Sequence, residues 1–231
     1  MALSIFLLGV INIRKIFKNI INIILILVII VYMKPIIDII QDSYQSHKAY
    51  KQAVREKEEL MNSKKFDWIT VKNTKVNYPV AWKERDNFYY LSHNIYDEES
   101  GHGAIFYEGS REPFSSHVTI VYGHCMRDKS MFATLHYLRE DETKFKESDV
   151  LIERADGSIK KYKPLGLYVT NENFFYTNLC KMSLDEGIQT IQENSKYFIP
   201  TEYDENDELL VLMTCSYEHE GDRLFVFYIS E

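Results

Sequence analysis

The chain has 231 residues and a formal net charge of −7. This length allows one domain of medium size together with an appendage. Residues 1–34 contain four cations and no acidic residue, so the rest of the chain holds an even larger excess of negative charge. That excess argues against a nucleic-acid partner and against adhesion to anionic surfaces, because both depend on basic residues.

The N-terminal part is predicted to be a membrane anchor. From Ile20 to Met33 the sequence is apolar except for one asparagine. Extending this stretch back to Ile16, with Lys18 reaching toward the interface, brings it close to the roughly 20 residues that a spanning helix needs. The alternative is a cleaved signal peptide. No small-x-small cleavage site follows Met33, where Lys34 and a proline stand instead, so an uncleaved anchor within residues 1–34 is expected.

The charges on either side of this stretch predict its orientation. Three cations between residues 14 and 18 precede it, whereas Asp38 and Asp42 follow it. The positive-inside rule then keeps the N-terminus in the cytoplasm and exports the remainder, as a single-pass protein of the cell membrane. The apolar stretch Ala2–Ile13 stays open between an interfacial segment and an extension upstream of the true start.

The three cysteines, Cys125, Cys180 and Cys215, are too few and too scattered for a disulfide framework. An odd number in an exported domain leaves at least one free thiol. The chain has no CxxC pair, which argues against a structural zinc site. We therefore predict no metal and no cofactor.

The rest of the chain divides into a helical segment and a strand-rich domain. Residues 35–65 are expected to form one helix or two, beginning at Pro35, because Ile36–Asn62 has neither glycine nor further proline. Residues 66–231 read as many short strands with a short helix over Met131–Leu138 and a second helix after Ser183, which has Glu186 in capping-box position. The predicted strands are Trp68–Val71, Val76–Val80, Ala104–Tyr107, Val118–Tyr122, Val150–Glu153, Ile159–Tyr162, Leu165–Thr170, Leu209–Thr214 and Leu224–Ile229. This pattern favours a mainly β fold, a closed β-barrel with inserted helices.

The segment Leu209–Cys215 carries the chemistry that is easiest to identify. An apolar strand delivers a cysteine to its end, and Arg223 follows on the next predicted strand. A thiol becomes a good nucleophile as the thiolate, which a guanidinium favours. His124, at the end of another predicted strand, could exchange protons with it. Cysteine, histidine and arginine together indicate covalent acyl transfer.

Two segments, Thr119–Leu135 and Leu209–Phe227, resemble the histidine and cysteine segments of sortases, the membrane-anchored cysteine transpeptidases of Gram-positive bacteria. The family's TLxTC motif falls on Val211–Cys215, with Val211 in place of the first threonine. The resemblance continues upstream and covers the chain from about residue 66 to its end. The upstream segments that carry it are Phe66–Trp82, Phe88–Asn94 and Gly103–Ser110.

Within the family, the N-terminal helices and the helix over Leu184–Tyr197, inserted between two late strands, are most similar to class B. Class D is the nearest alternative, although its members usually lack so long an inserted helix. The resemblance implies a sortase-type closed barrel over residues 66–231.

The resemblance also implies roles for particular residues. Cys215 would be the nucleophile, His124 the proton donor and acceptor, and Arg223 the cation that holds the substrate. The partners implied are the C-terminal sorting signal of an exported surface protein, cleaved after threonine, and a peptidoglycan precursor that supplies the accepting amine. Substrate binding is assigned, by resemblance only, to Leu91, Tyr176, Thr177, Met213 and Thr214.

Two other cysteine enzymes and one class without catalysis compete with this interpretation. An L,D-transpeptidase would place histidine and cysteine in one short motif, and a papain-like peptidase would have the cysteine first; His124 and Cys215 show neither pattern. A non-enzymatic, membrane-tethered binding module would need none of the three residues. Cys125 follows His124 directly and is expected to face away from Cys215, since neighbours on an extended chain point to opposite sides.

Overall fold

The computed structural model describes residues 2–171, 179–216 and 218–231, with side chains from Phe17 onward. The chain divides into two compact units, Met1–Tyr44 and Gln45–Glu231. Helix α1 (Ala2–Arg55) supplies the whole described part of the first unit and the beginning of the second. The short α2 (Lys57–Asn62) follows it.

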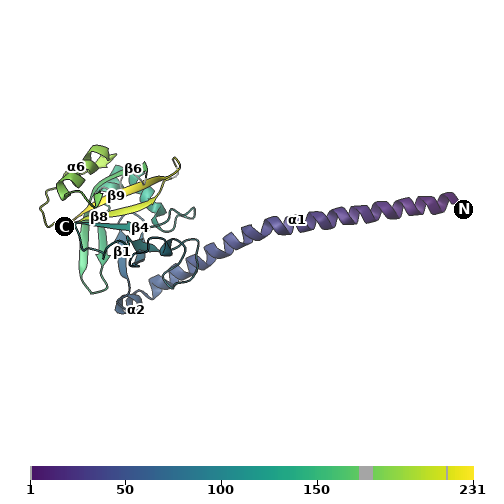
Figure 1. Ribbon diagram of the computed structural model, residues 1–231, viewed down its shortest axis with the longest axis horizontal. Helices are drawn as coiled ribbons and strands as arrows, with labels where there is room; N and C mark the ends of the chain where they lie inside the picture. Colours follow the sequence, from purple (N-terminus) through teal and green to yellow (C-terminus); the bar gives the residue numbers. More distant parts are fainter. Residues whose placement is uncertain (1, 172–178, 217) are drawn as a thin grey trace. The chain divides into compact units, whose positions relative to one another are not determined.

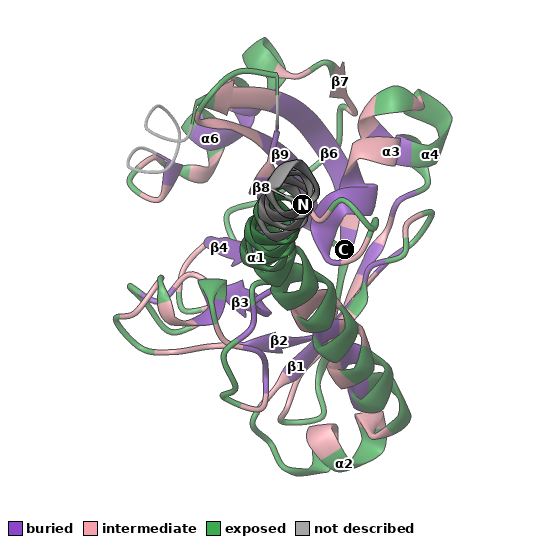
Figure 2. Ribbon diagram, turned by 90° about the vertical axis from the view of Figure 1, so that its right-hand side faces the viewer, coloured by how far each residue is buried: buried purple, intermediate pink, exposed green. Residues whose placement is uncertain are grey.

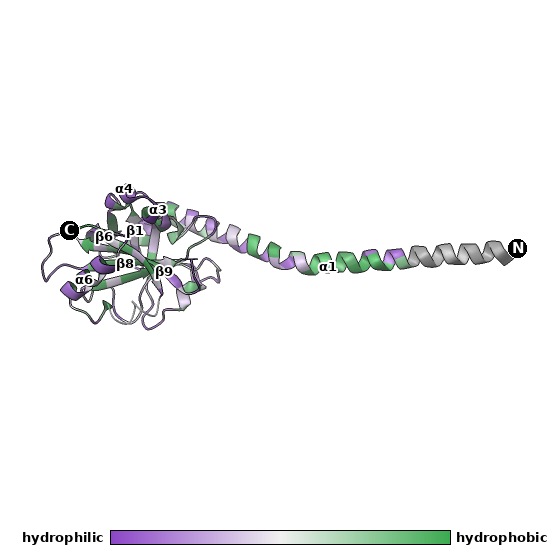
Figure 3. Ribbon diagram, turned by 90° about the horizontal axis from the view of Figure 1, so that it is seen from above, coloured by the Kyte–Doolittle hydropathy of each residue, from purple (hydrophilic) through white to green (hydrophobic). Residues whose placement is uncertain are grey.

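In the first unit, α1 exposes a nearly unbroken run of large apolar side chains from Phe17 to Ile40 (green in Figure 3). Among the described residues, one helical stretch, Phe17–Arg55, is long and apolar enough to cross a membrane by length and composition. Pro35 lies inside α1, so the expectation that a helix begins there is wrong. A proline removes one N–H donor from the helix, but the hydrogen bonds on both sides of it can continue.

One sheet dominates the second unit. Its strands are β1 (Asp67–Val71), β2 (Asn77–Ala81), β3 (Ile105–Tyr107), β4 (Val118–Tyr122), β5 (Val150–Glu153), β6 (Ile159–Asn171), β7 (Tyr197–Phe198), β8 (Leu209–Cys215) and β9 (Asp222–Ser230). Eight of them follow one another as β5-β1-β2-β3-β4-β8-β9-β6, and β6 pairs with β5 to close the barrel. The pairs β2–β3 and β4–β8 are parallel. The expected closed barrel is therefore confirmed (Figure 1).

Short helices connect the strands. They are the 3-10 turns η1 (Tyr89–Leu91) and η2 (Phe132–Leu135) and the helices α3 (His136–Glu140), α4 (Glu142–Lys146) and α6 (Leu184–Asn194). Helix α6 is the predicted inserted helix, and it lies between β6 and β7 in the chain. Ser183 and Glu186 form the expected capping box, in which each side chain bonds the other residue's backbone N–H. Ile188 and Ile191 are buried on its inner side.

The sequence pattern misjudged one part of the sheet. Ile159–Tyr162 and Leu165–Thr170 were expected as two strands, but they are one strand, β6, with a shift of register between Pro164 and Gly166. A proline cannot donate to the ladder, so its presence looks like a strand end when it marks an irregularity instead. The short α4 and β7 were not expected.

Strands β3, β4, β8 and β9 are largely buried on both faces, whereas β5 and the first part of β6 are buried on one face (purple in Figure 2). One set of side chains comes from every strand that closes the barrel, including Leu210 and Leu212, and fills the interior; we call it the inner cluster. The opposite faces of β4, β8 and β9 form a second set, the outer cluster, together with residues of α6 and η1. The outer cluster includes Val118, Ile120, Tyr122, Leu209, Val211, Phe225, Phe227, Ile229, Ile188, Ile191 and Tyr90.

Candidate active site

Cys215 is the last residue of β8, and its backbone pairs directly with that of Arg223 on β9. Side chains of directly opposed residues in an antiparallel pair lie on the same face, with Cβ atoms about 5 Å apart. Both residues are half-buried. The pairing therefore places the two side chains on one face of neighbouring strands, and Nη1 of Arg223 donates to the Asp222 carbonyl at 3.1 Å.

His124 reaches the same place from β4. This strand runs parallel to β8, with Tyr122 opposite Met213, and the Gly123 N–H donates to the Met213 carbonyl at 3.1 Å. Gly123 is packed so closely that a Cβ would lie 2.5 Å from Ile105 and 2.7 Å from Phe132. The glycine therefore allows the chain to leave the strand at this point and to carry His124 alongside the end of β8.

The register of the strands sets out the whole arrangement. Tyr122, Met213 and Phe225 form one row across β4, β8 and β9 on the outer face. Cys215 and Arg223 stand on the same face of β8 and β9, two positions from Met213 and Phe225, and His124 follows two residues beyond the end of β4. The partner of Arg223 on β6 is Thr170, which brings a hydroxyl to the end of this row. The sequence alone could not identify Thr170, because it lies in no motif and only the pairing of β6 with β9 places it there.

One hydrogen bond orients the imidazole of His124. Its Nε2 lies 3.0 Å from the carbonyl oxygen of Leu91, in η1. A carbonyl only accepts, so Nε2 carries the proton that is donated, and Nδ1 is the atom left to take up or release a proton. The structure thus brings Leu91 to His124 through its backbone, while 40% of Leu91 remains exposed.

A second histidine, which the sequence analysis missed, contacts the nucleophile segment. His136, at the start of α3, donates from Nε2 to the carbonyl oxygen of Cys215 at 3.1 Å. Three residues later, Arg139 forms an ion pair with Glu218, in the turn after β8. The proximity of His136 to the motif histidine was a usable signal, since a short helix so close in sequence has little room to move away from the end of β4.

The other two cysteines differ in their relation to Cys215. Burial raises the pKa of the Cys125 thiol, and the negative charge of an ionised Cys215 raises it further. The two thiols therefore interact electrostatically, and the alternation on which the expectation for Cys125 rested does not apply at this position. The reason is that β4 ends at Tyr122, and Cys125 instead pairs with Met131 in a loop. Burial also raises the pKa of Cys180, which lies beside Arg111, away from this pair.

The residues assigned to substrate binding are placed unevenly. Met213 lies on the face of Cys215 and is half-buried. Thr214 points to the other face and is only 2% exposed, and its hydroxyl has no hydrogen-bond partner among the described residues. Tyr176 and Thr177 fall outside the described residues.

Val211, which replaces a threonine of the TLxTC motif, is fully buried in the outer cluster. Its neighbours across the strands are Ile120 and Phe227. Valine and threonine have almost the same shape, and the methyl group suits this apolar position better than a hydroxyl would. The departure from the motif therefore changes the packing under the site and leaves the Cys215 row intact.

The arrangement combines a nucleophile, a proton carrier and a fixed cation in one half-buried row. Such a set can form and resolve a covalent acyl intermediate without a further group. Within the described part of the chain, no cluster of three or more histidine, cysteine, aspartate or glutamate side chains could hold a metal ion.

Comparison with known proteins agrees with this geometry. The family model of the sortase domain matches residues 69–228. Sortase B of Listeria monocytogenes is 28% identical over 71% of this chain and 67% of its own length, and sortase B of Staphylococcus aureus is 29% identical over 73% and 70%. A Bacillus anthracis crystal structure described as similar to sortase B shares 26% identity and a TM-score of 0.69, covering 81% of this chain and 96% of its own.

Proposed function

The chain belongs to the sortase family of cysteine transpeptidases and is most like class B, and from this premise we propose that it joins exported proteins to the cell wall. Its substrate would be a C-terminal sorting signal, cleaved after threonine, and its acceptor an amine of a peptidoglycan precursor. The observation that carries the proposal is the pairing of Cys215 with Arg223 on β8 and β9, together with the position of His124 just after β4, the strand that pairs with β8.

In the first step, the Cys215 thiolate attacks the carbonyl carbon of the substrate threonine. The electron pair of that carbonyl moves onto its oxygen, and Arg223 with nearby backbone N–H groups would stabilise the resulting oxyanion. When the carbonyl re-forms, the C–N bond breaks, and the departing amine takes a proton from Nδ1 of protonated His124. A thioester on Cys215 remains.

In the second step, the acceptor amine attacks the thioester carbonyl. His124, now neutral, takes a proton from the amine at Nδ1 as the new C–N bond forms. Breaking the C–S bond then returns Cys215 to the thiolate, and the product is an amide. A half-buried thioester at a strand end suits this exchange, because limited access of water leaves the acyl group for the amine.

The proposal includes an anchor in the membrane. The apolar side chains from Phe17 to Ile40 are all on the surface of α1, where water would contact them, and a bilayer would remove that cost. Three cations at residues 14–18 and the acidic Asp38 and Asp42 favour a cytoplasmic N-terminus and an external catalytic unit.

A peptide assay with the full chain in detergent micelles tests the activity. A panel of fluorogenic peptides is prepared, each with a sorting-type motif in which at least one residue follows the threonine. Each peptide is incubated with and without a diamine or oligoglycine acceptor. We expect cleavage, and a ligated product when the acceptor is present. Cys215→Ala should lower the rate at least about 1000-fold, because it removes the proposed nucleophile that forms the thioester. Cys180→Ala is the matched control and should retain the wild-type rate.

Cleavage that survives Cys215→Ala would reject the proposed nucleophile. Absence of cleavage across the whole panel by folded protein would favour a tethered binding module instead. Ligation with an amine would separate transpeptidation from simple hydrolysis by a cell-wall cysteine peptidase. The motif preferred within the panel would distinguish class B from class D.

A further inference from the structure

The segment Gln45–Arg55 of α1 lies in the same compact unit as the barrel. It contacts the loop after β4, which carries His124, and Gly103, which packs against the Leu91 carbonyl that accepts from His124. We propose that this segment is a positioning element for the catalytic histidine, and that it acts mainly through the contact of His47 with Asp128, in the loop after β4. The inference rests on the proposed function, in which His124 transfers the proton.

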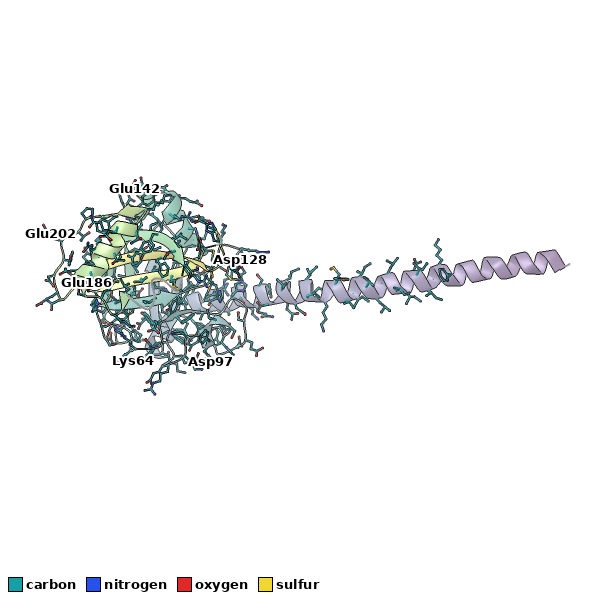
Figure 4. The ribbon with its side chains drawn as sticks, turned by 45° about the horizontal axis from the view of Figure 1, so that its top comes forward. Lys64, Asp97, Asp128, Glu142, Glu186 and Glu202 are labelled. Atoms are coloured by element: carbon teal, nitrogen blue, oxygen red, sulfur yellow. The ribbon has the colours of Figure 1, made fainter. Side chains whose placement is uncertain are left out.

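Asp128 fastens the loop that carries His124. Its Oδ2 accepts hydrogen bonds from Nε2 of His47, at 2.7 Å, and from Nε2 of His102, at 3.2 Å. Its Oδ1 accepts from the N–H and the hydroxyl of Ser130, at 2.9 and 2.6 Å. One carboxylate, labelled in Figure 4, thus ties the loop after β4 both to α1 and to the buried His102.

The carboxylate of Asp128 stays ionised over the whole working range of pH. Burial works to raise its pKa, but the hydrogen bonds from Ser130 and His102 and the charge of His47 outweigh burial and lower the pKa to about 2. Tyr78 is the other titratable group that senses this charge. We call Asp128 with His47 and His102 the clamp. Its acceptor, the Asp128 carboxylate, therefore stays ionised, while His47 and His102 supply the donors.

A second contact from α1 reaches the far end of the same loop. Tyr50 packs edge-on against Tyr78, with ring centroids 5.0 Å apart. The Tyr78 hydroxyl accepts from the N–H of Met131 at 3.1 Å. The next residue, Phe132, donates its N–H to the carbonyl of His124 at 3.0 Å, which closes the loop.

The third contact supports the Leu91 carbonyl, which accepts the hydrogen bond from the His124 imidazole. The Tyr50 hydroxyl donates to the Gly103 carbonyl at 2.7 Å, and Gly103 has a positive φ of 56°. A Cβ at Gly103 would lie 2.3 Å from the Tyr90 carbonyl and 2.9 Å from the Leu91 carbonyl. The Leu91 carbonyl is the one that accepts from His124. Through Gly103, α1 thus holds the atom that orients the ring.

These contacts meet on His124 and not on the other two catalytic residues. The loop fixes the backbone of His124, and Leu91 fixes its imidazole. Cys215 and Arg223 are held by the β8–β9 ladder instead. A change in the clamp should therefore alter proton transfer more than substrate binding, because a small displacement of a proton carrier is costly.

The test uses the full chain in micelles with His47→Ala, His47→Gln and, as control, Lys48→Ala, an exposed neighbour on the same helix. Cleavage kinetics are one readout. We expect His47→Ala to lower kcat about tenfold, with KM within about twofold. His47→Gln should recover much of this loss, since its amide can still donate to Asp128. Lys48→Ala should match the wild type.

The second readout does not need enzymatic activity. The rate at which iodoacetamide modifies Cys215 is measured by mass spectrometry over a range of pH. We expect His47→Ala to shift this profile, and the shift to vanish when His124→Ala is also present, because the clamp acts through His124. This double-mutant cycle of His47 and His124 needs no peptide cleavage, so it tests the positioning role even if the proposed function is wrong.

Two outcomes would overturn the positioning role. One is a Cys215 profile in His47→Ala that is identical to that of Lys48→Ala. The other is a shift of equal size with and without His124, which would mean a general loosening of the domain. Thermal unfolding of each variant is recorded alongside to separate loss of fold from loss of position.

Discussion

The two sides of the catalytic row are built differently. Cys215 and Arg223 stand on neighbouring strands, and a continuous backbone ladder from Leu209 to Cys215 sets their distance. His124 stands two residues beyond the end of its strand, and a carboxylate, two tyrosines and one carbonyl hold it. The nucleophile side thus depends on sheet register, whereas the proton-transfer side depends on side-chain contacts.

This difference has a practical meaning. A register cannot change by a small amount, because a shift of one residue turns every side chain to the other face. A loop held by side chains can be displaced slightly by a single substitution. The position of Cys215 and Arg223 is therefore either kept or lost as a whole, whereas the position of His124 can change by small amounts.

The largest effect on the ladder side is expected from Arg223→Lys. The backbone keeps the position and the charge stays, but the planar fork of donors is lost, and an ammonium cannot replace it. We predict a fall in kcat/KM of about 100-fold with little change in thermal stability. Steady-state kinetics with the preferred peptide measure it. Full activity in the lysine variant would show that charge alone is needed at this position.

A smaller effect is expected from His136→Ala, which tests whether the ladder alone holds Cys215. Loss of the donor to the Cys215 carbonyl should lower kcat about fivefold to tenfold, because the end of β8 has lost its side-chain hydrogen bond to α3. His117→Ala is the matched control, since His117 makes the same kind of bond, at 2.9 Å, to the Met182 carbonyl outside the row. Equal activity in both variants would mean that the backbone ladder suffices.

The smallest effect is expected at acid pH and concerns the His124 side. The pKa of Asp128 is lowered to about 2, below the ordinary value of about 3.9. The stabilisation from its ionised form is therefore complete above about pH 4 and is lost as the pH falls toward 2. Hydrogen exchange followed through this range should show the amides of Met131 and Phe132 losing protection before those of β8. Simultaneous loss would place both sides in one cooperative unit.

Much of the fold, and the positions of the three candidate catalytic residues at or near strand ends, could be predicted from the sequence, and the reason lies in the strands. Val118–Tyr122 and Leu209–Thr214 are apolar runs that end at polar chemistry, so the motif residues could be placed at strand ends. Strand ends that meet at one edge of a sheet bring their side chains together. The resemblance to sortases supplied the roles.

What could not be predicted depends on pairing and on loops. Thr170 and His136 join the site only through the β6–β9 register and the return of α3 to β8. The direction of Cys125 could not be predicted from two-residue alternation, because β4 ends before it. The sequence predicted a helix for the part of α1 after Tyr44, but it could not show that His47 and Tyr50 meet the loops of the barrel.

The burial of β8 and β9 on both faces has a consequence for the unfolded chain. Leu209–Met213 and Leu224–Ile229 carry no charge and no proline, and they combine high β-propensity with high hydrophobicity. Such windows aggregate readily when they are exposed. In the closed barrel each strand has a partner on both edges, so neither window offers a free edge to another molecule. Closure of the barrel thus also protects the newly made chain from self-association, and variants that slow closure should become insoluble before they lose specific activity.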